Sequence, residues 1–223
     1  MAYFDNDYNQ FFKDLAKNNH RDWFHENKKR YEKSVKDPFK AFTQEMINRV
    51  KALEPDLEQE PKDAVHRINR DIRFSKDKTP YKTKMSAVVS VKGRKSADYP
   101  SLFFELGPEN VAIYGGAYSV DKDQLLSIRE TIAGDIKGFQ KVINDKGFTS
   151  KYNGIHGEKN KRIDKQLMEA AEQEPLIMNK NFYYYAKFDP EMVTDPKLAD
   201  VFMEHYAAAK PVRDYLRKGL GFG

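Results

Sequence analysis

The residues most suited to chemistry lie in one basic segment, which reads R-I-N-R-D-I-R-F-S-K-D-K-T-P-Y-K over 67–82. Arginine guanidinium groups bind phosphate or carboxylate oxygens in pairs, and lysine ammonium groups add point charges. Apolar and polar residues alternate over 66–74, and this period of two predicts a β-strand. On such a strand Arg67, Asp71 and Arg73 share one face, so an ionised Asp71 is expected to hold both guanidinium groups in place.

A polar loop is predicted to follow this strand, with Pro80 stiffening it. Asp77 is expected either to cap the loop or to orient Lys78, and Tyr81 to offer a hydroxyl or a stacking face. The segment contains no glycine, so it is not a phosphate-cradling loop of the P-loop type. The predicted ligand-binding residues are Arg67, Arg70, Asp71, Arg73, Ser75, Asp77, Lys78, Tyr81 and Lys82.

The charge distribution singles out the same region. From Lys62 to Lys95 there are 11 Lys or Arg against 3 Asp, a net charge of +8. The rest of the chain has 28 Lys or Arg against 31 Asp or Glu, a net charge of −3, and the whole chain carries +5. A basic segment in an otherwise weakly acidic chain indicates an anionic partner.

Three functions stay open for this basic patch. The first is a site that binds, and could act on, a small anionic ligand, most simply one that bears phosphate. The second is a nucleic-acid binding module in which Tyr81 or Phe74 stacks on bases. The third is a structural network of ion pairs with no ligand. The acidic residues elsewhere in the chain would repel a long polyanion, which favours the small ligand. Basic side chains that converge in a pocket would support the small-ligand site, whereas basic side chains spread along an exposed ridge would not.

Composition excludes several other classes of site. There is no cysteine, which rules out disulfides, thiolate zinc sites and a cysteine nucleophile and fits the cytoplasm. The five histidines show no i, i+4 pair, so neither a metal nor a cofactor is expected. No secretory signal and no apolar run of about 18 residues is present, so no membrane partner is expected. No catalytic triad or nucleotide fingerprint stands out, which leaves enzymatic activity and oligomeric state undecided.

The elements that would carry the basic segment are helices on either side of a group of strands. This order predicts an α+β fold in a single domain over 1–223, with a mostly antiparallel central sheet flanked by N- and C-terminal helices. The helices are expected over 8–17, 21–35, from 37 onward, 121–133, 135–146, 163–172, 196–209 and 212–220, and further strands over 85–91, 101–106, 111–114 and 181–188.

Several residues outside the segment are expected either to support the site or to serve the fold. Asn18 is predicted to end the first helix in a left-handed conformation, and Asn19 to cap the second helix, with the indole of that helix buried. Gly115 and Gly116 are expected to end a strand, and Arg129 either to reach toward the basic segment or to pair with an acid. The possible supporting residues are Asn18, Asn19, Trp23, Gly116, Tyr118 and Arg129.

Four motifs follow one another along the chain: N-N-H-R-D-W-F over 18–24, R-D-x-R-F-S-x-D-K-x-P-Y-K over 70–82, G-G-x-Y over 115–118, and Ile128-Arg129. In this order they resemble one known family. The chain is similar to the bacterial and fungal conserved hypothetical proteins catalogued as domain of unknown function twenty-four sixty-one, over most of its length. The resemblance implies a single α+β domain and no established activity. Where many members read L-K-R-x-P, this chain has N-K-R-I-D over 160–164.

Overall fold

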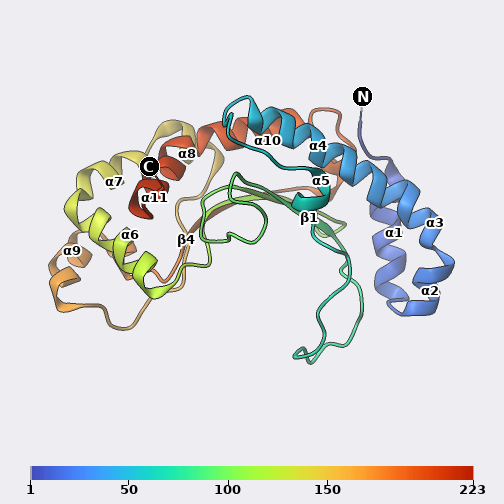
Figure 1. Ribbon diagram of the computed structural model, residues 1–223, viewed down its shortest axis with the longest axis horizontal. Coiled ribbons are helices and arrows are strands. Elements are labelled where there is room, and N and C mark those ends of the chain that lie inside the picture. The colour runs from blue at the N-terminus through green and yellow to red at the C-terminus, as the bar shows by residue number, and fades with distance from the viewer. Residues whose placement is uncertain (1, 223) are drawn as a thin grey trace. The chain divides into compact units, whose positions relative to one another are not determined.

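A computed structural model describes residues 2–222 and confirms the α+β class (Figure 1). Four strands pair in the order β1-β2-β3-β4 as an antiparallel sheet. All four lie within or close to the ranges expected from sequence. They are β1 (Met85–Val89), β2 (Leu102–Leu106), β3 (Val111–Ala117) and β4 (Phe182–Phe188).

The boundaries of the N-terminal helices differ from those predicted from sequence. The helix expected over 21–35 is interrupted, and no break marks the start of the next helix at Asp37-Pro38. A π-helical turn, Glu32–Lys36, runs directly into α4. Proline lacks the N–H that a continuous α-helix needs, and the wider π turn lies at that point. The helices are α1 (Asn6–Lys17), α2 (Arg21–Glu26), α3 (Lys28–Tyr31), α4 (Asp37–Lys51) and α5 (Pro61–Ala64).

Internal contacts divide the chain into two compact units. Unit 1 comprises 1–94, 103–113 and 187–203, and unit 2 comprises 95–102, 114–186 and 204–223. The single domain over 1–223 therefore stays a prediction. The basic segment belongs entirely to unit 1, so its geometry is described within that unit.

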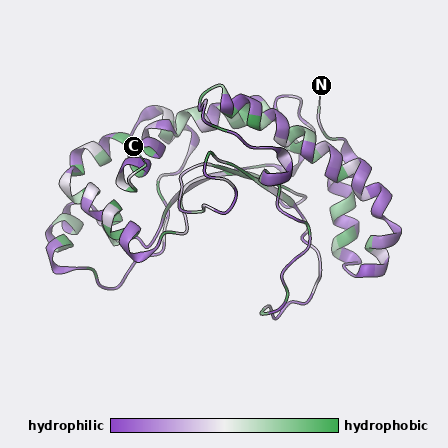
Figure 2. Cartoon of the chain, viewed as in Figure 1, coloured by the Kyte–Doolittle hydropathy of each residue, from purple (hydrophilic) through white to green (hydrophobic). Residues whose placement is uncertain are grey.

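Aromatic rings fill the core of unit 1. Apolar residues recur every three or four positions along α4 and form one buried face, which includes the fully buried Phe39, Phe42 and Met46. The edge of Phe42 meets Phe104 of β2, with ring centroids 5.4 Å apart. The hydroxyl of the buried Tyr8 donates to the carbonyl of Leu106 at 3.1 Å, which ties α1 to β2. Figure 2 shows hydrophilic and hydrophobic stretches alternating along α4, as one buried face requires.

Unit 2 packs helices and strands around a second set of rings, including Phe139, Phe148 and Phe182. The single helix expected over 135–146 is two helices in the structure. The carboxylate of Asp145 accepts a hydrogen bond from the backbone amide of Phe148 at 3.1 Å and so caps the start of a second helix. The helices of this part are α6 (Lys122–Gly134), α7 (Ile136–Ile143), α8 (Lys146–Lys151), α9 (Met168–Gln173) and α11 (Lys210–Gly219), and α10 (Leu198–Ala208) contributes to both units. Within residues 2–222, no helix combines the length and apolarity needed to cross a membrane.

Candidate functional site

The basic segment forms a long loop on a short antiparallel ribbon, and the strand expected over 66–74 is wrong. Only two isolated bridges, Val65–Ala87 and Asn69–Tyr81, pair the two sides of the ribbon. Beyond Asn69 the backbone leaves the extended pairing and returns at Tyr81. Side-chain hydrogen bonds within the loop replace the backbone ladder there, which explains why the alternating pattern did not produce a strand.

Arg70 is the centre of that network. Its guanidinium binds the carboxylate of Asp77 and the hydroxyl of Thr79, and also reaches the Thr79 carbonyl at 3.3 Å. The Asp77 carboxylate in turn accepts from the backbone N–H and the hydroxyl of Thr79, both at 2.9 Å. Ser75 adds a longer contact, 3.5 Å from its hydroxyl oxygen to Arg70. Asp77 therefore caps the loop, one of its two expected roles, and it neutralises Arg70.

Asp71 pairs with only one of its two expected arginines. Arg73 donates to both carboxylate oxygens of Asp71, at 3.0 and 2.7 Å. Asp71 makes no hydrogen bond to Arg67 within residues 2–222, although the charge of Arg67 does help to lower its pKa. The hydrogen bond from the Arg73 side chain is the main reason that the pKa of Asp71 falls to about 2. The side chain of Arg73 is 77% exposed, so this pair lies in solvent and encloses nothing.

The tip of the loop presents an aromatic ring to solvent. Phe74 is 95% exposed. The guanidinium carbon of Arg73 lies 5.8 Å from the centre of its ring. Lys78 is not oriented by Asp77: its ammonium group donates to the carbonyl of Ile72 at 2.9 Å, across the loop.

Tyr81 anchors the end of the loop and does not offer its ring to a ligand as expected. It is buried, and its ring stacks on Phe24 with centroids 4.0 Å apart. Asn19 holds its backbone: the side-chain amide donates to the Tyr81 carbonyl at 3.0 Å and accepts from its N–H at 3.1 Å. The expected capping role of Asn19 is wrong, because the imidazole of His20 accepts from the amide of Trp23 and caps α2.

The neighbouring residues of this corner serve the fold. Asn18 ends α1, but with φ −133°, so the expected left-handed conformation is wrong. Its side chain donates to the carbonyl of Asp14 at 3.0 Å. Trp23, expected to be buried, is only half-buried and lies against Phe11, with ring centroids 5.7 Å apart. Of the corner residues, Asn19 alone touches the basic segment through a hydrogen bond within residues 2–222.

A cluster of cations with fewer acidic partners than Arg70 and Arg73 lies at the base of the loop. Burial, then the charges of Arg67 and Lys84, lower the pKa of the half-buried Lys82. Neither Arg67 nor Lys82 makes a side-chain hydrogen bond or ion pair within residues 2–222. Burial and the charges of Lys82 and Arg94 likewise lower the pKa of His66. We call this group the basal cluster; it comprises His66, Arg67, Lys82, Lys84 and Arg94.

One acid partly balances the basal cluster. The carboxylate of Glu105, a residue only 7% exposed, pairs with Lys84 at 2.7 Å. The guanidinium of Arg94 donates to the carbonyl of Val65, which leaves its charge uncompensated by that bond. Of these residues, the sequence pattern predicted only Arg67 and Lys82 as ligand-binding residues. A usable signal existed: Lys82 and Lys84 are two residues apart as the chain enters β1, and an acid inside the apolar strand L-F-F-E-L needs a partner.

The three expected supporting residues of unit 2 have structural partners of their own. Gly116 has φ +102° inside β3, and a Cβ there would clash with the carbonyl oxygen of Phe182 on β4. The two glycines therefore do not end the strand. Tyr118 is exposed and meets Tyr183 edge-on at 5.4 Å.

Arg129 neither joins the basic segment nor forms an ion pair within the described residues. It is 6% exposed and donates to the carbonyl of Asn179 at 2.9 Å. Burial lowers its pKa. Its Nε and both polar side-chain atoms of Asn179 are buried without a hydrogen-bond partner within residues 2–222. This is a buried polar contact between α6 and the chain before β4, and its role lies within unit 2.

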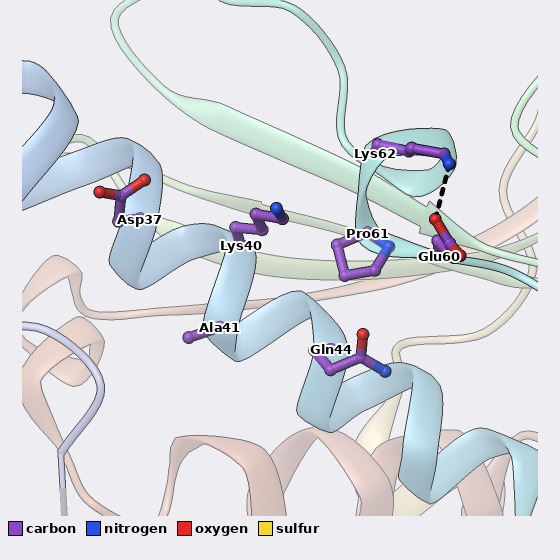
Figure 3. Close-up of a pocket in the computed structure, with 7 residues that line it drawn as sticks. All are labelled: Asp37, Lys40, Ala41, Gln44, Glu60, Pro61 and Lys62. Carbon is purple, nitrogen blue, oxygen red and sulfur yellow. Dashed lines mark ion pairs between the residues drawn. The ribbon is translucent and has the colours of Figure 1, made fainter.

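One cavity of unit 1 lies apart from the predicted site residues (Figure 3). It has a volume of about 470 Å³ and lies between α4 and the start of α5. Glu60 and Lys62 pair with each other at 2.7 Å, so their charges are satisfied. None of the predicted ligand-binding residues lines it. Its lining residues are Asp37, Lys40, Ala41, Gln44, Glu60, Pro61 and Lys62.

Comparison with known proteins gives a family without an assigned activity. No curated protein and no solved structure matches the chain. A family model described as "Conserved hypothetical protein (DUF2461)" matches residues 7–215, which include the whole basic segment, the Asn19 corner, and the Gly116 and Arg129 positions. The chain belongs to this family of conserved hypothetical proteins.

Proposed function

We propose that the chain binds an anionic, phosphate-bearing ligand at the basal cluster. The observation that carries the proposal is a half-buried lysine without a counter-ion: the side chain of Lys82 makes no hydrogen bond or ion pair within residues 2–222. Burial, followed by the charges of Arg67 and Lys84, lowers its pKa accordingly. Like charges held together are unfavourable unless an anion joins them. Perturbed cations of this kind are more common at functional sites than on ordinary surfaces.

The remaining arginines of the segment have a supporting role in this proposal. Asp77 and Asp71 already neutralise Arg70 and Arg73, so these two pairs hold the loop in shape and leave less charge for a ligand. Asn19 fixes the backbone of Tyr81, next to Lys82. The loop and the corner therefore position the basal cluster, and the cluster supplies the charge.

Thermal unfolding tests the proposal. Sulfate, inorganic phosphate or a nucleotide should raise the melting temperature relative to chloride at equal ionic strength. An anion that binds only the folded state stabilises it by about 2.7 kcal/mol at a hundredfold excess over Kd. The variants Arg67→Ala and Lys82→Ala should each reduce the rise, and together abolish it.

A matched control is Lys13→Ala, which removes an exposed positive charge from α1. This variant should respond to anions as the unaltered protein does. A rise that survives the loss of both Arg67 and Lys82 would contradict the proposal. Equal losses in all the variants would show a general effect of net charge and would contradict it too.

Nucleic-acid binding is the second candidate, and one specific observation favours it. The loop tip carries an almost fully exposed ring, Phe74, beside exposed cations. A small anion at the basal cluster has no use for that ring. The third alternative, a purely structural ion-pair network, accounts for Arg70 with Asp77 and for Arg73 with Asp71, but not for Lys82.

A further inference from the structure

Phe74 is exposed on a loop that is held in a defined shape. A phenylalanine buries a large apolar surface when it can, and this one is 95% exposed. The chain on either side is fixed by the Arg70–Asp77–Thr79 network and by the bond from Lys78 to the carbonyl of Ile72. The exposure is therefore part of the folded loop, and the ring can bind a partner with little further loss of conformational freedom.

The loop that carries the ring is also rich in cations. Arg73 lies near the ring at 5.8 Å and is itself held by Asp71. Lys76 and Lys78 follow within four positions and are both exposed. The partner that fits this tip therefore combines negative charge with a flat surface that can stack on an aromatic ring.

Single-stranded nucleic acid has both properties. Proteins that bind it pair a positively charged track for the phosphates with aromatic side chains on which unpaired bases stack. A membrane surface fits less well, because stable attachment needs a larger apolar contact than one ring flanked by Ser75 and Lys76. In a duplex the base faces are already stacked and closed to Phe74.

We propose that the loop binds single-stranded nucleic acid, with an unpaired base stacked on Phe74 and the adjacent phosphate bound by Lys76. This deepens the function proposed above and rests on it, since the basal cluster would bind phosphates further along the same strand. Phe74 lies seven positions after Arg67, at most about 25 Å along an extended chain, so a strand of a few nucleotides reaches both places.

The acids elsewhere in the chain do not prevent this contact. In Figure 1 the 70–80 loop extends away from α4 and β1 of its own unit. Exposed charges more than about 8 Å apart are largely screened at physiological ionic strength. The repulsion from the acidic remainder of the chain is therefore weak at the tip.

The test measures binding of fluorescent single-stranded DNA and RNA, from about 4 to about 16 nucleotides long. Each is compared with an abasic oligonucleotide of the same length, which keeps the phosphates and lacks the bases. Phe74→Ala should weaken binding of the normal strand about five- to one-hundredfold, the effect of losing one stacked base. It should not weaken binding of the abasic strand. Phe74→Trp should restore the affinity, whereas Phe74→Leu, apolar but not aromatic, should not.

Separate variants distinguish failure of this inference from failure of the proposed function. If Arg67→Ala and Lys82→Ala weaken binding of both strands but Phe74→Ala changes neither, the anion site stands and the stacking inference is overturned. If Arg67→Ala and Lys82→Ala change nothing, the proposed function itself fails.

A vesicle assay supplies the remaining outcome. Vesicles rich in phosphatidylserine that retain the unaltered protein and the Phe74→Leu variant, but not Phe74→Ala, would show insertion of an apolar side chain and would overturn stacking. Because Phe74 is exposed, all three Phe74 variants should fold, and unchanged melting temperatures would verify this.

Discussion

The side chain of Asn19 binds the backbone of Tyr81 through two hydrogen bonds, one donated at 3.0 Å and one accepted at 3.1 Å. An amide side chain that donates and accepts in this way takes the place of a neighbouring strand at the end of the loop. Tyr81 is held on its other side by the stacked ring of Phe24. The corner between α1 and α2 therefore fixes the point at which the basic loop returns to the sheet.

Asn19→Ala should release this point. Each net hydrogen bond contributes about 0.5–1.5 kcal/mol, so the loss of two predicts a decrease of about 1–3 kcal/mol in the free energy of unfolding, measured with urea. Anion affinity should fall as well, because Lys82 follows Tyr81. Asn18→Ala is the control, since its one side-chain bond stays within α1. It should leave anion affinity unchanged, and equal losses of affinity in the two variants would contradict the positioning role of Asn19.

The carboxyl group of Asp77 should stay ionised in strongly acidic solution. The backbone N–H of Thr79, followed by the Arg70 side chain, lowers the pKa of Asp77 to about 2. Because folding lowers the pKa of this carboxyl group, the ionised form stabilises the folded loop at any pH above 3.8, the pKa in the unfolded chain. This stabilisation is lost as the pH falls toward 2. Carboxyl carbon chemical shifts followed by NMR would measure the midpoint, and a value near 3.8 would show that the Arg70 network does not form.

The same network predicts the proteolytic behaviour of the loop. Asp77→Asn keeps the size of the side chain and removes its charge, so Arg70 loses its ion pair. Trypsin should then cleave after Arg73 or Lys76 faster than in the unaltered protein. Ser75→Ala is the matched control, because Ser75 contributes only a 3.5 Å contact, and it should change the rate little.

Sequence patterns predicted the regular elements well and the loop poorly, for a physical reason. The ring-rich β4 and the α6 helix that Asp121 caps depend on local periodicity and capping, which a sequence displays directly. The alternation over 66–74 is also local, but the bonds that decide its structure join Arg70 to residues seven and nine positions later. Side-chain bonds across a loop leave no period in the sequence.

Long-range partners explain the remaining differences. Asn19 looked like a helix cap because asparagine commonly is one, yet its partner Tyr81 lies 62 positions away. The Lys84–Glu105 pair depends on the register between β1 and β2, which a single sequence does not specify. The basic segment itself could be recognised from sequence, because the net charge of a stretch is the sum over its residues and does not depend on their contact partners.

Two glycines of unit 2 should respond to alanine in opposite directions. At Gly116 the φ of +102° and the close approach of the Phe182 carbonyl oxygen both exclude a Cβ, so Gly116→Ala should cost more than about 2 kcal/mol. Gly134 ends α6, and a methyl group added there would meet no neighbouring group within 4 Å, so Gly134→Ala should stabilise by about 0.4–1 kcal/mol. Urea midpoints would measure both, and a tolerated Gly116→Ala would contradict the close pairing of β3 with β4.

His66 should link pH to anion binding at the basal cluster. Burial, then the charges of Lys82 and Arg94, lower its pKa below the ordinary 6.5. Folding therefore favours the neutral imidazole. The contribution of His66 to the free energy of unfolding is fully present above pH 6.5 and is lost as the pH falls through the lowered pKa of the folded protein. A bound anion offsets the charges of Lys82 and Arg94 and should raise this pKa again.

Linkage then fixes the direction of the effect on affinity: sulfate should bind more tightly as the pH falls through the range in which His66 gains its proton. Sulfate is the suitable probe because its own charge stays constant there. NMR titration of the imidazole signals should show a higher midpoint for His66 with sulfate than without. His66→Asn should remove the pH dependence of sulfate affinity and retain binding. An unchanged His66 midpoint at saturating sulfate would place the anion away from the basal cluster and contradict the proposed site.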